Sequence, residues 1–94
     1  MATVMVMNWS GVTTAHYEAL RREVNFEKDA PHGGKYHVAW ATPEGMHIVD
    51  VWDSQATFES FLRDRLMPAV QKLKIPGEPK VEFHPAHNTF APNP

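Results

Sequence analysis

The segment MHIVDVWDSQATF, residues 46–58, constrains the fold more than any other part of the chain. Its first half is rich in isoleucine and valine, which favour a β-strand. Asp53 and Ser54 follow at once, and residues of these types cap the N-termini of helices. The segment therefore predicts a strand that leads directly into a helix, with the acidic side chain of Asp50 inside the strand.

Apolar patterning elsewhere predicts three further strands and one further helix. Tyr17, Leu20 and Val24 fall at the i, i+3 and i+7 spacing of one helix face. Pro68 lies inside the second helical pattern and predicts a kink or a restart near Met67, because proline removes a backbone donor. The predicted strands are residues 3–9, 35–41, 46–52 and 80–87, the helices are residues 13–26 and from 54 to the loop at 75–79, and residues 88–94 are a tail.

The predicted order is βαββαβ in one domain, residues 1–94. The right-handed crossover rule makes the first and third strands neighbours, so we expect a four-stranded antiparallel sheet with both helices on one face. We expect the uncovered face to carry Met5, Met7, Phe83 and some of the tryptophans, too large an apolar patch for a monomer. A homodimer with a barrel-like core is predicted; a monomer with a polar outer face is the alternative.

Composition limits the class of protein. The formal charge of −2 argues against a nucleic-acid binder, which would present a basic face. The absence of cysteine suits a reducing compartment, so we expect a cytoplasmic protein. The apolar run at residues 4–7 lacks the basic leader and cleavage site of a signal peptide, and no run has the length of a membrane span.

The best functional lead is a histidine–aspartate pair across the predicted hairpin. If residues 42–45 form the loop, His37 lies opposite Asp50 on the neighbouring strand. A carboxylate beside an imidazole fixes the tautomer of a general base. The alternative is a cross-strand ion pair that only sets the register. A shift of one residue would send the two side chains to opposite faces.

Asn8 and the aromatic residues are further candidates. Asn8 ends an apolar strand and needs a hydrogen-bond partner, which is backbone, water or the carbonyl group of a ligand. Trp40 and Trp52 line either a substrate pocket or a plain core or dimer interface. Arg65 is either a solvated charge or a group that closes over a pocket and holds an anion.

The six histidines invite a metal hypothesis, which the spacing disfavours. His84 and His87 are three residues apart in a predicted strand and so point to opposite faces. His37 and His47 also fall on opposite faces in the expected register. No cysteine and no H-E-x-x-H motif is present, so we expect no metal site.

The element order resembles that of the ferredoxin-like, dimeric α+β barrel superfamily. The third-strand sequence VDVWDS at residues 49–54, followed by Phe58, Phe61 and the LMP sequence at residues 66–68, resembles its antibiotic-biosynthesis monooxygenase type (ABM). The resemblance covers nearly the whole chain. The superfamily includes cofactor-independent oxygenases of aromatic polyketides, haem-degrading enzymes, isomerases and stress-associated proteins, so it implies the fold more strongly than the reaction.

The haem-degrading branch of this superfamily uses an asparagine in the first strand, a tryptophan in the second helix and a later histidine. Asn8 matches the asparagine, but Phe61 stands in place of the tryptophan and Gln71 in place of the histidine. An amide is a poor iron ligand beside imidazole. We therefore expect no haem and no other cofactor.

Two hypotheses follow. The first is a cofactor-independent monooxygenase or isomerase that binds a small aromatic or carbonyl metabolite between sheet and helices, with an acid/base pair and an asparagine for the oxyanion. The second is a non-catalytic small-molecule-binding or stress-associated dimer. A cavity of about 300 Å³ or more beside the histidine favours the first. The candidate catalytic residues are His37, Asp50 and Asn8, and the candidate substrate-binding residues are Trp52, Phe61, Trp40, Arg65 and His87.

Overall fold

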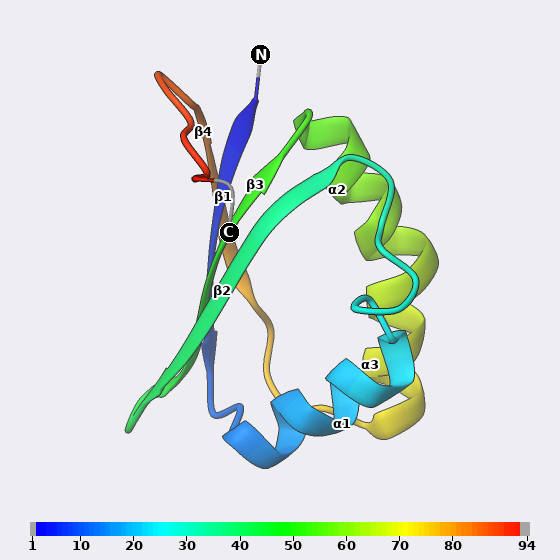
Figure 1. Cartoon of the computed structure of the whole chain (residues 1–94). Helices are drawn as coiled ribbons and strands as arrows, with labels where there is room; N and C mark the ends of the chain where they lie inside the picture. The colour runs from blue at the N-terminus through cyan, green and yellow to red at the C-terminus, as the bar shows by residue number, and fades with distance from the viewer. Residues whose placement is uncertain (1, 93–94) are drawn as a thin grey trace.

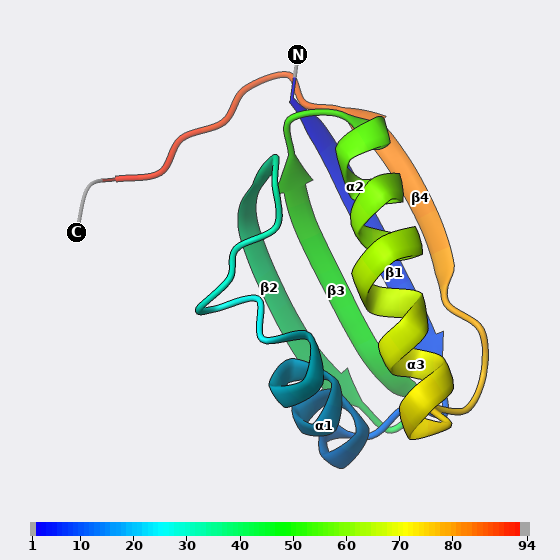
Figure 2. The same cartoon turned by 90° about the vertical axis from the view of Figure 1, so that its right-hand side faces the viewer.

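The computed structural model describes residues 2–92 and confirms the predicted order of strands and helices (Figure 1). The strands are β1 (Thr3–Ser10), β2 (Gly34–Thr42), β3 (Gly45–Trp52) and β4 (Lys80–Pro85). The helical elements are α1 (Thr14–Val24), α2 (Gln55–Phe61), the π-helical segment η1 (Leu62–Leu66) and α3 (Met67–Leu73). Because α2, η1 and α3 follow one another without a break, they form one long helical rod (Figure 2).

The strands form one four-stranded antiparallel sheet in the order β2-β3-β1-β4. β1 and β3 are central neighbours, as the crossover rule predicts. All helical elements lie on one side of the sheet, which bends around them (Figures 1 and 2). The predicted α+β class and ferredoxin-like arrangement are confirmed. Within residues 2–92, no helix or strand covers the other face of the sheet.

The β2–β3 hairpin has the predicted register. His37 lies opposite Asp50, and Ala39 lies opposite Ile48. Gly45, at the start of β3, has φ 151°, and a Cβ atom there would collide with the carbonyl oxygen of Trp9. The turn therefore requires glycine, because β1 passes directly against its backbone.

The second helical region restarts near Pro68, as predicted. The backbone N–H of Met67 donates to the carbonyl of Leu62, the i→i−5 bond of a π-helix. Pro68 is the second residue of α3, directly after the π-helical segment, and it donates no backbone hydrogen bond to the preceding turn. The π-helical segment thus absorbs the proline without a sharp break. None of the helices within residues 2–92 has both the length and the apolar character that a membrane crossing requires.

The core lies between the sheet and the helices, and here one prediction is wrong. Met5 and Met7 are each only 1% exposed and face the helices, and Phe83 packs against the same core. They do not lie on the uncovered face. The VMVM sequence of β1 is apolar at both parities, so its pattern could not identify the inward side.

The uncovered face is nevertheless apolar at its centre and over β2, whereas its β4 edge carries Lys80, Glu82 and His84. Val4, Val6, Val49 and Val51 are half-buried at its centre, and it extends to three exposed side chains of β2, which are Tyr36, Val38 and Trp40.

The fourth strand is shorter than predicted. It ends at Pro85, and the N–H of Ala86 makes one further bond, to the carbonyl of Ala2. His87 has no strand partner because β1, its neighbour, begins at Thr3. The tail then runs away from the body (Figure 2), and Phe90 is 84% exposed. Residues 93–94 of the predicted tail lie outside the described residues.

Candidate functional site

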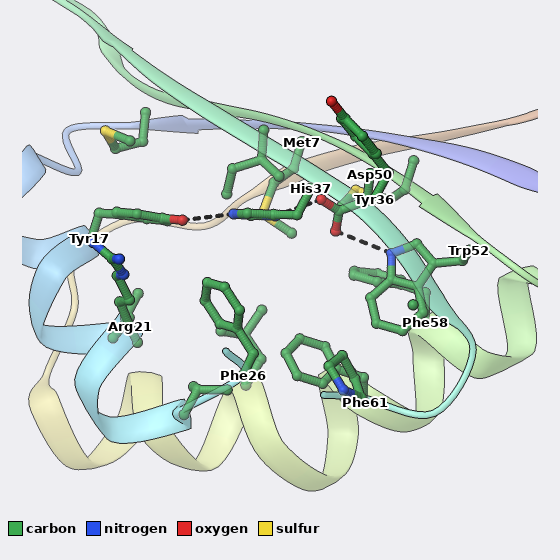
Figure 3. A pocket seen from close by; sticks show the side chains of 18 of the residues that line it. Met7, Tyr17, Arg21, Phe26, Tyr36, His37, Asp50, Trp52, Phe58 and Phe61 are labelled. Atoms are coloured by element: carbon green, nitrogen blue, oxygen red, sulfur yellow. Dashed lines mark hydrogen bonds and ion pairs between the residues drawn. The ribbon is translucent and has the colours of Figure 1, made fainter. Parts of the chain in front are cut away.

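A cavity of about 250 Å³ lies between the inner face of the sheet and the helices (Figure 3). Its wall is mostly apolar and combines side chains from the central strands, both helical regions and the α1–β2 connection. The large contributors are Met5, Met7, Leu20, Phe26, Ile48, Trp52, Phe58, Phe61 and Leu66. The polar groups of the wall are concentrated around His37 and Asp50, so the cavity has one chemically distinct side.

The hairpin register places the acid and the imidazole of this side. Nδ1 of His37 lies 2.6 Å from Oδ1 of Asp50. Asp50 is 7% exposed, and its other oxygen accepts a hydrogen bond from Nε1–H of Trp52 at 3.1 Å. Both carboxylate oxygens are thus bonded, as a buried charge requires. The prediction that His37 and Asp50 meet is confirmed as geometry.

A tyrosine completes the chain of hydrogen bonds. Oη of Tyr17 lies 2.6 Å from Nε2 of His37. A carboxylate can only accept, so the His37 proton belongs on Nδ1, and Nε2 then accepts from the tyrosine hydroxyl. The order of donation is Tyr17 to His37 to Asp50, the arrangement by which a histidine and an acid activate a hydroxyl group.

The sequence pattern predicts Tyr17 only as a core-facing helix residue, so it does not indicate this part of the site. Thr13 caps α1, and the helix turns its Tyr17 face toward the sheet. The available signal was a phenolic hydroxyl on an apolar helix face, because a buried hydroxyl needs a partner. Burial raises the pKa of Tyr17, while the nearby Arg21 charge lowers it less, so the phenol is protonated at neutral pH.

Aromatic rings hold the imidazole in place. The rings of Tyr17 and His37 are nearly coplanar, with centroids 6.1 Å apart and an angle of 7° between their planes. Phe26, from the connection after α1, approaches His37 to 5.1 Å between centroids. Arg21 binds the Glu27 carboxylate through two bonds of 2.6 Å. That pair lowers the pKa of Glu27 and ties the connection beside Phe26 to the helix.

Two predicted binding residues belong to this region in different ways. Phe61 lines the cavity and contacts Trp52, with centroids 5.4 Å apart. Arg65 does not line the cavity; its guanidinium lies over the Phe61 ring, 5.5 Å from the centroid, and it borders a separate surface hollow. Its guanidinium donates to the carbonyls of Val24 and Asp29 at 2.9 and 2.7 Å. Arg65 therefore holds the end of α1 and the following connection, rather than an anion in the cavity.

Three other predicted site residues are not brought to the cavity. Asn8 and Trp40 face the uncovered side of the sheet, where Oδ1 of Asn8 accepts from Nδ1 of His47 at 2.7 Å and Trp40 stacks on the same imidazole. The predicted joint action of Asn8 with His37 is therefore wrong, because strand alternation sends them to opposite faces. His87 lies beyond the end of β4 at Pro85 and does not line the cavity. Its predicted place in the pocket is therefore wrong. Among residues 2–92, no three His, Asp or Glu side chains are grouped to hold a metal ion.

Solved structures of similar shape identify the type of fold. A protein of unknown function from Nitrosomonas europaea matches with a TM-score of 0.71 and 15% identity, over 99% of this chain and 95% of the other. SnoaB, a cofactor-independent oxygenase from Streptomyces nogalater, matches with a TM-score of 0.68 and 14% identity, over 94% and 95%. The chain has the fold of the antibiotic-biosynthesis monooxygenases. No protein-family model and no curated protein matches its sequence.

A third structure of this monooxygenase-like fold contains a ligand. The ActVA-Orf6 monooxygenase of Streptomyces coelicolor, in complex with nanaomycin D, matches with a TM-score of 0.54 and 14% identity, over 98% of this chain and 92% of the other. At these identities the likeness establishes the fold alone. The cavity of this chain, about 250 Å³, touches His37 but is slightly smaller than the expected 300 Å³.

Proposed function

We propose that this protein is a cofactor-independent enzyme that acts on a small aromatic or carbonyl metabolite, with His37 and Asp50 as its acid/base pair. The observation that carries the proposal is the hydrogen-bonded chain of Tyr17, His37 and Asp50 on the wall of an otherwise apolar cavity. Aromatic walls with a few convergent polar groups are typical of small-molecule sites. The monooxygenase-like fold, which SnoaB uses without a cofactor, adds to this support.

The acid and the base have separate tasks in this proposal. Proton transfer to the imidazole creates a cation next to Asp50, and that buried carboxylate stabilises the cation without taking the proton. Trp52 holds the second carboxylate oxygen and so fixes the orientation of the acid. Burial of the Asp50 carboxylate strengthens its interaction with this cation, because charges interact more strongly away from water.

A ligand screen by thermal shift tests the proposal. Small aromatic and carbonyl compounds are expected to stabilise the wild type by about 2.7 kcal/mol at a hundred times their Kd. His37→Ala should reduce this stabilisation, because the Tyr17 hydroxyl on the cavity wall loses the partner that orients it. His84→Ala, which removes an exposed histidine paired with Glu82 on β4, should retain it. Equal stabilisation of both variants would contradict a role for His37, and binding without product formation, followed by mass spectrometry, would favour the non-catalytic alternative.

We also propose that the uncovered face of the sheet packs against a second copy of the chain. Val49 lies at its centre, paired with Val6 of β1 and Val38 of β2. Trp40 and Val38 are each 46% exposed, so the face presents contiguous apolar surface of the kind that marks an interface.

A charge at the centre of this face should separate the two copies. Val49→Lys is expected to sediment as a monomer where the wild type sediments as a dimer, because the interface would bury an unpaired ammonium group. Gln55→Lys, at an exposed position on α2, adds the same charge and should leave the dimer intact. A wild type that is monomeric at micromolar concentration in sedimentation velocity would overturn the proposal.

A further inference from the structure

We infer that the phenol of Tyr17, rather than the imidazole of His37, is the group that touches the bound molecule, and that the cavity selects neutral, weakly acidic molecules over carboxylates. This inference rests on the proposed function and assigns its substrate contact. Figure 3 shows Tyr17, His37, Asp50 and Trp52 in a row along the sheet side of the cavity, with Phe26 and Phe61 across from them.

The first argument is that both nitrogens of His37 are occupied. Asp50 holds Nδ1 and Tyr17 holds Nε2, each at 2.6 Å. A molecule in the cavity could reach the imidazole only by displacing the tyrosine. The tyrosine oxygen keeps lone-pair capacity after it has donated its proton to His37. A proton from a bound molecule therefore meets the Tyr17 oxygen first.

The second argument concerns the other polar groups on the wall within residues 2–92. The Asp50 oxygens accept from His37 and Trp52, whose indole N–H is thereby used. The guanidinium of Arg21 donates to Glu27 and to Glu18. Lys35, also on the wall, is paired with Asp53 at 3.1 Å, and the side chain of Tyr36 is 62% exposed on the uncovered face of the sheet. The phenol oxygen of Tyr17 is therefore the polar contact that these residues leave available. A molecule with one hydroxyl or carbonyl group on an apolar body matches this wall.

The third argument is electrostatic. The buried charge at the cavity is the Asp50 carboxylate, and the Arg21 cation at the wall is paired with two glutamates. A bound carboxylate would lose its hydration without gaining an unpaired cation, which is costly in an apolar site. The raised pKa of Tyr17 agrees with this reasoning, because the same surroundings disfavour a phenolate.

The relay moves protons and needs no oxidant or reductant. The acidic C–H or O–H bond of the bound molecule breaks, and its proton goes to Oη of Tyr17. The original Tyr17 proton passes to Nε2 of His37 over the 2.6 Å hydrogen bond. The products are the anion of the bound molecule, a neutral tyrosine and an imidazolium ion next to Asp50. Reversal returns a proton to the same or a neighbouring atom, as in the isomerisation of an enolisable carbonyl compound.

Binding of three naphthalene probes tests the selectivity. The wild type is expected to bind 2-naphthol up to about tenfold more tightly than 2-methylnaphthalene, because one neutral hydrogen bond is worth up to that factor. It should also bind 2-naphthol more tightly than 2-naphthoate, whose charge would lose its hydration. Tyr17→Phe should bring 2-naphthol to the level of 2-methylnaphthalene, because only the oxygen is lost. Tyr36→Phe is the matched control: Tyr36 also borders the cavity, but its side chain is 62% exposed and points away from it (Figure 3), so this variant should bind as the wild type does. Preference of the wild type for 2-naphthoate would overturn the inference.

Deuterium exchange of 2-tetralone in D₂O, followed by NMR, tests the relay. The wild type should accelerate exchange at the carbon next to the carbonyl group, and Tyr17→Phe should lose about a hundredfold of that rate, typical of a general acid–base group. Exchange that is lost in His37→Ala but retained in Tyr17→Phe would overturn this inference and leave the proposed function standing. A wild type that neither binds the probes nor exchanges 2-tetralone would overturn both.

Discussion

Replacing Gly45 with alanine is expected to lower the free energy of unfolding by about 3 kcal/mol, which is the upper range for a strained backbone position. Gly45 has φ 151°, and an added methyl group would collide with the carbonyl oxygen of Trp9 in β1. Either β1 or the turn must move, because the carbonyl oxygen of Trp9 belongs to the backbone and cannot rotate away as a flexible side chain would. Urea unfolding followed by circular dichroism measures the loss.

The same substitution should reach the candidate site. The turn next to Gly45 sets the register that places His37 opposite Asp50. Gly11→Ala is the matched control, because Gly11 also has a positive φ, 80°, but a Cβ atom there meets nothing within 4 Å. We expect it to cost about 1–2 kcal/mol, the penalty of the left-handed backbone alone. Equal losses in the two variants would show that the contact with Trp9 is unimportant.

Replacing Phe58 with alanine is expected to lower the free energy of unfolding by about 3–5 kcal/mol, as for other buried phenylalanines. Phe58 is 2% exposed and packs edge to face against Trp52 and Phe83, with centroids 5.4 and 5.6 Å away. Phe90→Ala is the matched control. Its side chain is 84% exposed in the tail, so its removal should change stability by less than about 0.5 kcal/mol.

Phe58→Ala should also enlarge the cavity, because the Phe58 ring forms part of its wall. A small aromatic compound such as naphthalene is then expected to raise the melting temperature of Phe58→Ala more than that of the wild type, since apolar cavities take up apolar molecules. Calorimetry at matched naphthalene concentrations measures the difference. No gain in the variant would mean that the surrounding core collapses into the space.

The hairpin shows how much local sequence can determine. A four-residue turn of Thr42, Pro43, Glu44 and Gly45 leaves one register for strands of these lengths, so the meeting of His37 and Asp50 was predictable. The change of helix geometry near Pro68 was also predictable, because a proline lacks the backbone N–H that a regular helix interior requires.

Other features depended on long-range packing. Met5 and Val6 are equally suited to a core, and only the position of the helices decides that Met5 faces inward. That decision also sends Asn8 to the outer face, away from His37. Tyr17 reaches His37 because α1 packs across the edge of the sheet, a placement that no local pattern of residues 13–26 contains. The His37–Asp50 part of the site thus follows from local sequence, whereas the Tyr17 part depends on tertiary packing.

The alternation of β3 has an evolutionary consequence. Asp50 faces the cavity, while its neighbours Val49 and Val51 face the uncovered side. Inserting or deleting one residue within this strand would turn the side chains on one side of the change to the opposite face of the sheet. Asp50 would then leave the cavity and a valine would enter it. Point substitutions can tune either surface alone, but insertions and deletions cannot. Related genes should therefore vary in length at their loops and tails while β3 keeps a constant count between Gly45 and Trp52.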